Sequence, residues 1–364
     1  MRISRLQILF LLLTIFCLNF PLSASGSVGA GVNASEEFHS KEEKLDVQKV
    51  IFEHMLDSYE WHIAGKAVIH LPVILYSKSS GWHIFSSKHL HENGGSYRNF
   101  YPADLNSARA GKLMEKMPDG SFVRPLDLSF TKMSLAIFIN SIVLLLIVLP
   151  VARWYRKNIA TDAVPGKFAS VVESVAIYIE DEVIKPCVGE NYKKFSPYLL
   201  TIFFFILVCN LMSLIPFFPG GIGVTANMSI TMFLALCTFI AINLWGTKEY
   251  WKEILWPDVP VFLKAPFPMM QIIEILGLFT KPVALMIRLF ANMLGGHMAM
   301  LVLTLLIFIG FGVGKALGGS MTFLSVVFNI FLNVLELLVA FIQAYVFTLL
   351  SAVFIGMAQV KHHH

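Results

Sequence analysis

The stretch Lys281–Met293 reads KPVALMIRLFANM and places an arginine inside a long apolar segment. It opens the first of two such segments, 282–309 and 320–358, and neither proline nor glycine interrupts residues 320–355. As one helix, residues 320–355 would measure about 54 Å, whereas the hydrocarbon core of a bilayer is about 30 Å thick. That helix must tilt by roughly 55° from the membrane normal or project beyond the membrane. The sequence therefore predicts that both helices are long and strongly tilted.

Three further apolar segments precede this pair. Residues 133–152 carry no charge, and neither do residues 195–247, which Pro219-Gly220-Gly221 divides into spans of about 196–217 and 225–246. Each is about long enough to cross a bilayer. We therefore predict a mainly α membrane protein with five transmembrane helices, in a membrane domain covering residues 131–361.

The N-terminus is typical of an exported protein. Arg2 and Arg5 precede the apolar run Ile8–Phe20, and small residues follow it, so we interpret residues 1–26 as a signal peptide. The alternative is a first transmembrane helix that is retained, but a 13-residue run is short for a span. Both interpretations export the segment that follows, which suggests a bacterial cell envelope.

Residues 27–130 differ from the rest of the chain because they hold 24 of its 52 charged side chains. A helix is predicted at Val47–Leu56, and strands at Ala67–Tyr76 and Trp82–Ser86 flank the hairpin signal Ser77–Gly81. Pro118-Asp119-Gly120 indicates a second turn. These patterns predict a small exported α+β module.

Composition excludes several classes of function. The chain is 56% hydrophobic and 14% charged, whereas soluble domains carry about 25% charged residues, so a soluble globule or a nucleic-acid-binding protein fits poorly. Its four cysteines lack metal-ligand spacing, and histidines such as His89 and His91 form no helical His-x-x-x-His pair. The sequence predicts no cofactor, no metal site and no nucleic-acid partner, and the tail 362–364 is three histidines without an expected role.

Basic residues set the predicted orientation, because cytoplasmic loops are enriched in lysine and arginine. The loop 153–194 holds seven basic residues and the loop 248–264 holds three, whereas Lys132 and Lys315 are those near the spans on the opposite side. With an exported N-terminal module and five spans, the C-terminus is expected in the cytoplasm of a bacterium, and the protein in its inner (plasma) membrane.

Ionisable residues inside the apolar segments point to function. Arg288, His297 and Glu336 cannot all reach the membrane surface, and an arginine at mid-bilayer costs about 2.5–3.5 kcal/mol on insertion scales. Glu274 and Lys281 lie nearer the predicted inner boundary, where their heads can reach water. A permanent cation with two groups that exchange protons is what a proton path requires, although interhelical hydrogen bonds are an alternative explanation for polar residues in spans.

The last helix carries a predicted polar stripe. Asn329, Glu336 and Gln343 are spaced seven apart, with Ser325 and Asn333 four residues on either side of Asn329. On the preceding helix, Arg288 and Asn292 share one face, and His297 lies about 13 Å further along on roughly the opposite face. For Asn210, Ser213 and the pair Thr231 and Thr238 we expect plain packing.

Three motifs in the right order carry a family resemblance over about residues 130–360. Lys281–Met293 resembles the signature helix of subunit a of F-type ATP synthases, the stator channel beside the rotating c-ring. Gln343-Ala344-Tyr345-Val346-Phe347 resembles that family's last membrane helix, and Asn210–Pro216 (NLMSLIP) its second span. Residues 27–130 fall outside the resemblance.

The resemblance implies a role for each site residue. Arg288 matches the family's essential arginine, which faces the c-ring carboxylate and blocks leakage between two half-channels. His297 and Glu336 match the pair lining the half-channel on the exported side, in an order reversed from many bacterial members. Asn292 and Gln343 match polar positions that flank the arginine, and Glu274 matches an acidic position near the inner channel.

The resemblance also implies partners. They are the c-ring, b-type stator subunits, the rest of the ATP synthase and the lipid bilayer. The chain itself is then a non-catalytic proton-channel component, and the sequence shows no phosphate loop. The sequence is compatible with either H⁺ or Na⁺ as the coupling ion.

Two other classes of function fit the sequence less well. A secondary transporter could bind an anionic substrate at Arg288, but such proteins show internal repeats, and none relates the first three spans to the last two. A membrane scaffold for the exported module leaves Arg288 unexplained.

Overall fold

The computed structural model describes residues 57–64, 67–92, 96–103, 112–117, 122–158, 165–215, 218–255 and 269–359. The described residues fall into two compact units, 137–297 with 330–359, and 57–136 with 298–329. The predicted signal peptide 1–26, the helix Val47–Leu56, the turn Pro118–Gly120 and the tail 362–364 lie outside the described residues.

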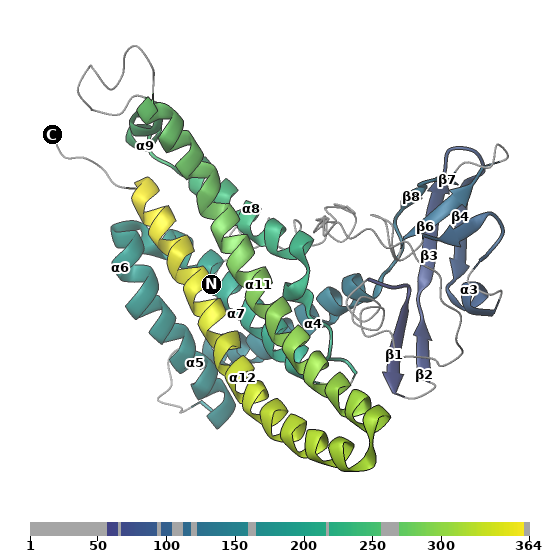
Figure 1. The fold of residues 1–364 in the computed structure, drawn as a ribbon. Coiled ribbons are helices and arrows are strands. Elements are labelled where there is room, and N and C mark those ends of the chain that lie inside the picture. Colours follow the sequence, from purple (N-terminus) through teal and green to yellow (C-terminus); the bar gives the residue numbers. More distant parts are fainter. Residues whose placement is uncertain are drawn as a thin grey trace. The chain divides into compact units, whose positions relative to one another are not determined.

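The N-terminal module is built from short antiparallel sheets (Figure 1). Their order is β1-β2, β4-β3-β8 and β5-β6-β7, and one short helix, α3 (Lys88–Glu92), follows β4. The strands are β1 (Glu60–Ala64), β2 (Ala67–His70), β3 (Pro72–Ser77), β4 (Gly81–Ser86), β5 (Phe100–Pro102), β6 (Leu113–Lys116), β7 (Phe122–Val123) and β8 (Leu126–Asp127). The described part of the N-terminal region therefore contains sheets.

The core of the module lies on one face of the sheet β4-β3-β8. Val73, Leu75 and Phe85 alternate with outward-facing residues, as the two-residue period of a strand requires. The rest of the buried cluster is Tyr59, Leu90, Phe100 and Leu113, with Tyr97 packed against it. The tight hairpin predicted at Ser77–Gly81 is present, since these two residues pair in the β3–β4 register.

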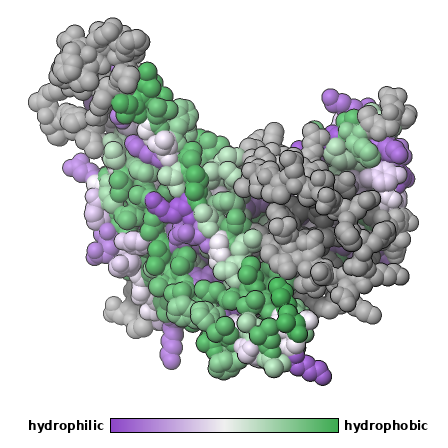
Figure 2. Space-filling model, in the orientation of Figure 1, coloured by the Kyte–Doolittle hydropathy of each residue, from purple (hydrophilic) through white to green (hydrophobic). Residues whose placement is uncertain are grey.

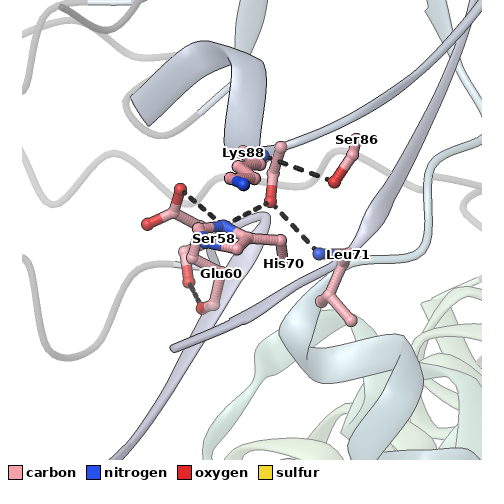
Figure 3. A network of polar contacts seen from close by, with 7 residues as sticks. Ser58, Glu60, His70, Leu71, Ser86 and Lys88 are labelled. Carbon is pink, nitrogen blue, oxygen red and sulfur yellow. Dashed lines mark hydrogen bonds and ion pairs between the residues drawn. The ribbon is translucent and has the colours of Figure 1, made fainter. Parts of the chain in front are cut away.

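The predicted strand Ala67–Tyr76 is in fact two strands that belong to different sheets. The break falls at Leu71, whose N–H donates to Tyr59 O (3.2 Å) and Ser87 Oγ (3.1 Å), and Pro72 follows with no N–H to donate. In Figure 3, His70 points toward Glu60, and its Nδ1 lies 3.5 Å from Glu60 Oε1 and 3.5 Å from Ser87 Oγ. This polar network fixes the point where the chain changes sheets.

The buried carboxylate of Glu115 binds the turn of the β3–β4 hairpin. Glu115 is 4% exposed, and its Oε1 accepts hydrogen bonds from Ser79 Oγ (2.8 Å) and Ser80 Oγ (3.3 Å). Burial alone would raise the pKa of Glu115, but the serine hydroxyls and the charge of His83 outweigh it and lower that pKa below 4.5. The hairpin turn is therefore tied to strand β6.

Helices form the rest of the described chain, which confirms the mainly helical prediction. They are α4 (Lys132–Lys157), α5 (Lys167–Ile179), a π-helical turn (Glu180–Ile184), α6 (Lys185–Val188), α7 (Tyr192–Leu214), α8 (Met228–Leu244), α9 (Lys248–Leu255), α11 (Met269–Val313) and α12 (Lys315–Gln359). Short 3₁₀ turns lie at Gly189–Asn191 and Val224–Ala226.

Four helical segments in the described residues are long and apolar enough to cross a membrane: Lys132–Lys157, Lys167–Leu214, Gln271–Val313 and Lys315–Gln359. The second is not one straight rod, because Gly189 adopts a positive φ (+74°) where α6 ends. The apolar helix α8 has 17 residues, about 26 Å at 1.5 Å per residue, and is shorter than a usual span.

The last two helices each contain 45 residues and run side by side as an antiparallel pair (Figure 1). Each would measure about 68 Å, which is longer than the predicted spans 282–309 and 320–358 imply. Gly314 alone separates them, and the neighbouring glycines, Gly310, Gly312, Gly318 and Gly319, lie inside the helices. At Gly318 an added Cβ would lie 2.5 Å from the Phe311 ring, so this glycine permits the close crossing at the hairpin end.

The reversal between α7 and α8 lies in the predicted place. Gly221 adopts a positive φ (+78°) and its N–H donates to Met212 O (3.2 Å), which turns the chain back at the end of α7. An added Cβ at Gly220 would lie 2.6 Å from that same Met212 oxygen. Only glycine fits so close to the helix end.

Candidate functional site

Helix α11 presents Arg288 on an exposed face. Asn292, one turn further on, is exposed as well, while Leu285, Leu289 and Met293, on the adjacent face about 100° round the helix, are at most 2% exposed. The 3.6-residue period of the helix therefore separates a polar, outward-facing pair from a packed apolar face. Among the described residues, no carboxylate lies within 4.0 Å of the Arg288 guanidinium.

His297 and Glu336 meet between α11 and α12. His297 Nδ1 lies 3.5 Å from Glu336 Oε1, and the two side chains are 20% and 6% exposed. They are 39 residues apart in the sequence, and the antiparallel pairing of the helices brings them together. A carboxylate so deeply buried is costly unless a proton or a cation compensates it, so the pair is suited to holding and exchanging a proton.

Two glycines make room for this pair, and sequence reasoning missed both. A Cβ added at Gly296 would lie 2.9 Å from Glu336 Oε1, and one added at Gly223 would lie 2.8 Å from the His297 ring. Both distances are below ordinary van der Waals contact. The Gly295-Gly296 doublet inside an apolar helix was the available signal, because glycine there is unfavourable for the helix by about 1 kcal/mol.

A buried amide network holds α12 against α7, and plain packing was the wrong expectation for Asn210 and Ser213. Asn210 is 0% exposed, and its Nδ2 donates to Ala340 O (3.2 Å), one turn beyond Glu336. Thr225 Oγ1 donates to Asn210 Oδ1 (2.7 Å), and Ser213 Oγ donates to Asn210 O (2.6 Å). Asn210 thereby links α7, the 3₁₀ turn before α8, and α12.

The remaining predicted site residues lie elsewhere on the same two helices. Gln343 is 6% exposed on α12, two turns beyond Glu336. Glu274 lies near the start of α11 and close to Tyr250 of α9. Burial raises the pKa of Tyr250, and the negative charge of Glu274 raises it further. Of the predicted polar stripe, Ser325, Glu336 and Gln343 are buried, whereas Asn333 is exposed.

The outer surface of this helix pair is strongly apolar. Figure 2 shows hydrophobic colour over most of the visible helical surface, with a hydrophilic patch enclosed by it. On α11 and α12 the exposed apolar residues include Ile287 (50%), Ile330 (62%), Val334 (63%), Leu337 (53%) and Leu338 (57%). Exposed apolar area of this extent is typical of a surface that faces lipid or a protein partner.

Comparison with known proteins agrees with this arrangement. A family model described as ATP synthase A chain matches residues 135–356, and a separate model described as a domain of unknown function (DUF8433) matches residues 50–128. The second match covers most of the sheet module.

Curated relatives carry the same description as the larger match. "ATP synthase subunit a 2" of Chlorobaculum tepidum is 43% identical over 243 residues, which is 64% of this chain and 64% of the relative. "ATP synthase subunit a" of Chlorobium phaeobacteroides is 33% identical over 308 residues (82% and 86%), and that of Myxococcus xanthus 38% over 246 residues (66% and 76%). The chain therefore belongs to the subunit a family of F-type ATP synthases, and it is a multi-pass protein of the bacterial plasma membrane.

Proposed function

We propose that the chain conducts protons to and from a c-ring through two offset half-channels, with Arg288 facing the ring carboxylate. Family membership supports the proton-translocating role in the membrane sector. One observation carries the finer statement: α11 exposes Arg288 on one face and, nine residues on, holds His297 against Glu336 on another. A fixed cation and a proton-exchanging pair thus occupy separate faces of one helix.

In this mechanism a proton enters from the exported side past His297 and Glu336 and neutralises a c-subunit carboxylate. The neutral carboxylate then rotates into lipid, and after nearly a full turn it releases its proton into the inner half-channel. Each unit charge that crosses 100 mV contributes about 2.3 kcal/mol. The chain itself forms no bond to nucleotide, so ATP chemistry belongs to partner subunits.

Arg288 has two tasks in the proposal. Its guanidinium keeps its proton at any relevant pH, so it favours the ionised form of a carboxylate that comes within about 4–6 Å. The same positive charge repels a proton that would pass directly between the two half-channels. Its exposed position on α11 fits a partner that supplies the carboxylate from another subunit.

The other site residues support these two paths. Asn292 shares the exposed face of Arg288, and Gln343 lies on α12 near the level of the charged groups. Glu274 is assigned to the inner half-channel. The buried Asn210 network holds the α12 segment between Glu336 and Gln343 in place.

The proposed topology has five spans, with α8 as the short third one. Residues 1–26 are a signal peptide, the module 27–130 is outside, and the C-terminus is cytoplasmic, with a b-type stator subunit as a further partner. The lengths of α11 and α12 support a tilted pair lying along the curved flank of the ring, because an upright helix needs only about 20 residues.

Disulfide cross-linking tests which face meets the ring. In a chain whose native cysteines are replaced by serine, Ala291→Cys places a thiol on the exposed face beside Arg288, and Leu289→Cys is the matched control on the buried face. With a cysteine beside the ring carboxylate, we expect oxidation to link the Ala291→Cys chain to subunit c and to leave the Leu289→Cys chain unlinked. Cross-linking of the Leu289→Cys chain alone would reject the proposed orientation.

A methyl group at Gly296 should disturb the proton path. In Gly296→Ala the new Cβ lies 2.9 Å from Glu336 Oε1, so the carboxylate must move away from His297. We expect ATP-driven proton pumping by reconstituted vesicles to fall several-fold. Gly277→Ala is the control, because it gives the same helix-propensity gain but its Cβ meets nothing within 4 Å. Equal pumping by both variants would mean that the pair's geometry does not matter.

A further inference from the structure

The sheet β4-β3-β8 has a large apolar face that points away from the core of the module. Tyr76 pairs with Trp82 on one side and with Leu126 on the other, and Ile74 pairs with Ile84. These residues share one face because their strand positions differ by two. Tyr76 is 38% exposed, Leu126 54%, Trp82 60% and Ile84 73%, so the face is turned to its surroundings.

The same face continues to the start of the first long helix. Beyond β8, Leu128 N–H donates to Ile74 O (2.9 Å) and Phe130 N–H donates to Pro72 O (3.3 Å), so the chain stays beside β3. Phe130 is 45% exposed and lies two residues before α4 begins at Lys132. The outer sheet face, defined as Tyr76, Trp82, Ile84, Leu126 and Phe130, therefore leads into α4.

The junction with α4 leaves little freedom. Lys132 N–H donates to Ser58 O (2.8 Å) and Met133 N–H donates to Asp57 Oδ1 (3.2 Å), so residues preceding β1 satisfy the open N–H groups of the first helical turn. The sheet is thus fixed to the end of a helix that is long and apolar enough to cross the membrane.

Among the described residues of the module, acidic and basic side chains have different surroundings. Its described acidic side chains act internally: Asp57 at the α4 junction, Glu60 beside His70, Glu115 on the serines and Asp127 on Tyr59. In the described part of the module, the exposed charged side chains are basic: Lys78, Lys88, Arg98 and Lys116. Over its whole length, the segment 27–130 carries 13 acidic and 11 basic residues. Lys78 lies in the β3–β4 turn, at the end of the outer sheet face.

We propose that the outer sheet face rests on the anionic lipid surface of the membrane that α4 crosses. Tryptophan and tyrosine favour the lipid–water boundary, and Trp82 and Tyr76 contact each other with ring centroids 5.0 Å apart. Ile84, Leu126 and Phe130 supply apolar area, while Lys78 at the end of the face meets anionic headgroups. The proposal rests on the membrane placement of α4, and it holds for either leaflet.

Quenching of Trp82 fluorescence tests this contact in the reconstituted full chain. The chain has six tryptophans, so the Trp82 signal is the difference between wild type and Trp82→Phe. In vesicles containing phosphatidylglycerol, we expect brominated lipid to quench that signal and aqueous iodide to quench it severalfold less than a free indole. The control reporter is Phe122→Trp in the Trp82→Phe chain, because Phe122 is 56% exposed but lies on another sheet, and it should respond to iodide.

Each result decides the proposal. Strong iodide quenching of Trp82 would overturn it, and so would shielding from both quenchers, which would mean that a protein covers the face. Equal bromolipid quenching of both reporters would overturn a specific contact. If brominated lipid quenches Trp82 less in pure phosphatidylcholine than in vesicles with phosphatidylglycerol, anionic headgroups contribute to the contact. Equal quenching in the two kinds of vesicle would overturn that electrostatic contribution. Resistance of the chain to alkaline extraction is scored separately, so failure of membrane insertion is distinguished from failure of docking.

Discussion

Arg288→Ala is expected to abolish ATP-driven proton pumping while the membrane sector still assembles. Without the guanidinium, nothing on the exposed face of α11 holds the ring carboxylate in its ionised form, so the ring cannot release its proton in step. The electrostatic barrier between the half-channels is lost as well, and passive proton leak should rise. The measurement is proton flux, driven by ATP in vesicles holding the assembled ATP synthase, and driven by a potassium diffusion potential in vesicles holding the membrane sector alone.

Arg288→Lys separates charge from shape. Lysine keeps a positive charge but lacks the planar fork of donors and can lose its proton when buried, so coupled pumping should again be lost. Arg153→Ala, near the C-terminal end of α4, is the matched control and should pump normally. Normal pumping by Arg288→Ala would contradict the channel mechanism and would reassign Arg288 as a structural or substrate-binding charge.

Glu336→Gln is expected to reduce pumping by at least about tenfold, because the amide keeps the volume of the side chain but cannot accept and pass on a proton. The packing against Gly296 and His297 stays nearly unchanged, so assembly should be intact. Passive leak should not rise, since Arg288 is still present. The same vesicles therefore distinguish a blocked path from a lost barrier.

Glu190→Gln is the control for this change, because Glu190 is an exposed carboxylate in the turn before α7. If Glu336→Gln pumps like Glu190→Gln, protons do not pass through Glu336. The pair with His297 would then be a structural contact between two helices.

The sequence located the helices well but not their ends. Apolar length reports how much of a segment suits lipid, whereas a helix continues as long as its backbone bonds are satisfied. Helix α11 thus begins at Met269 and passes through Pro282, where we expected it to start, because a proline inside a membrane helix is tolerated when neighbouring groups compensate. The short strands of the module were harder, and the break at Leu71 depends on contacts with Tyr59 and Ser87.

The site shows the same division. Arg288, His297 and Glu336 could be chosen from the sequence because ionisable groups in apolar segments are expensive and rare. The residues that support this site, such as Asn210 and Gly223, could not be chosen from the sequence, because their roles depend on contacts between positions that are distant in the chain. Asn210 is 130 residues from Ala340, and Gly223 matters only because the His297 ring occupies the space beside it.

The one-residue connection at Gly314 constrains how this chain can change in evolution. Since α11 and α12 are continuous on either side of it, a residue inserted within either helix between His297 and Glu336 would rotate the helix beyond it by about 100° and advance it by about 1.5 Å. A single insertion or deletion inside a helical arm would therefore turn one of the two side chains away from the other. Substitutions can accumulate along these two helices, and a change in length is tolerated best at the connection itself.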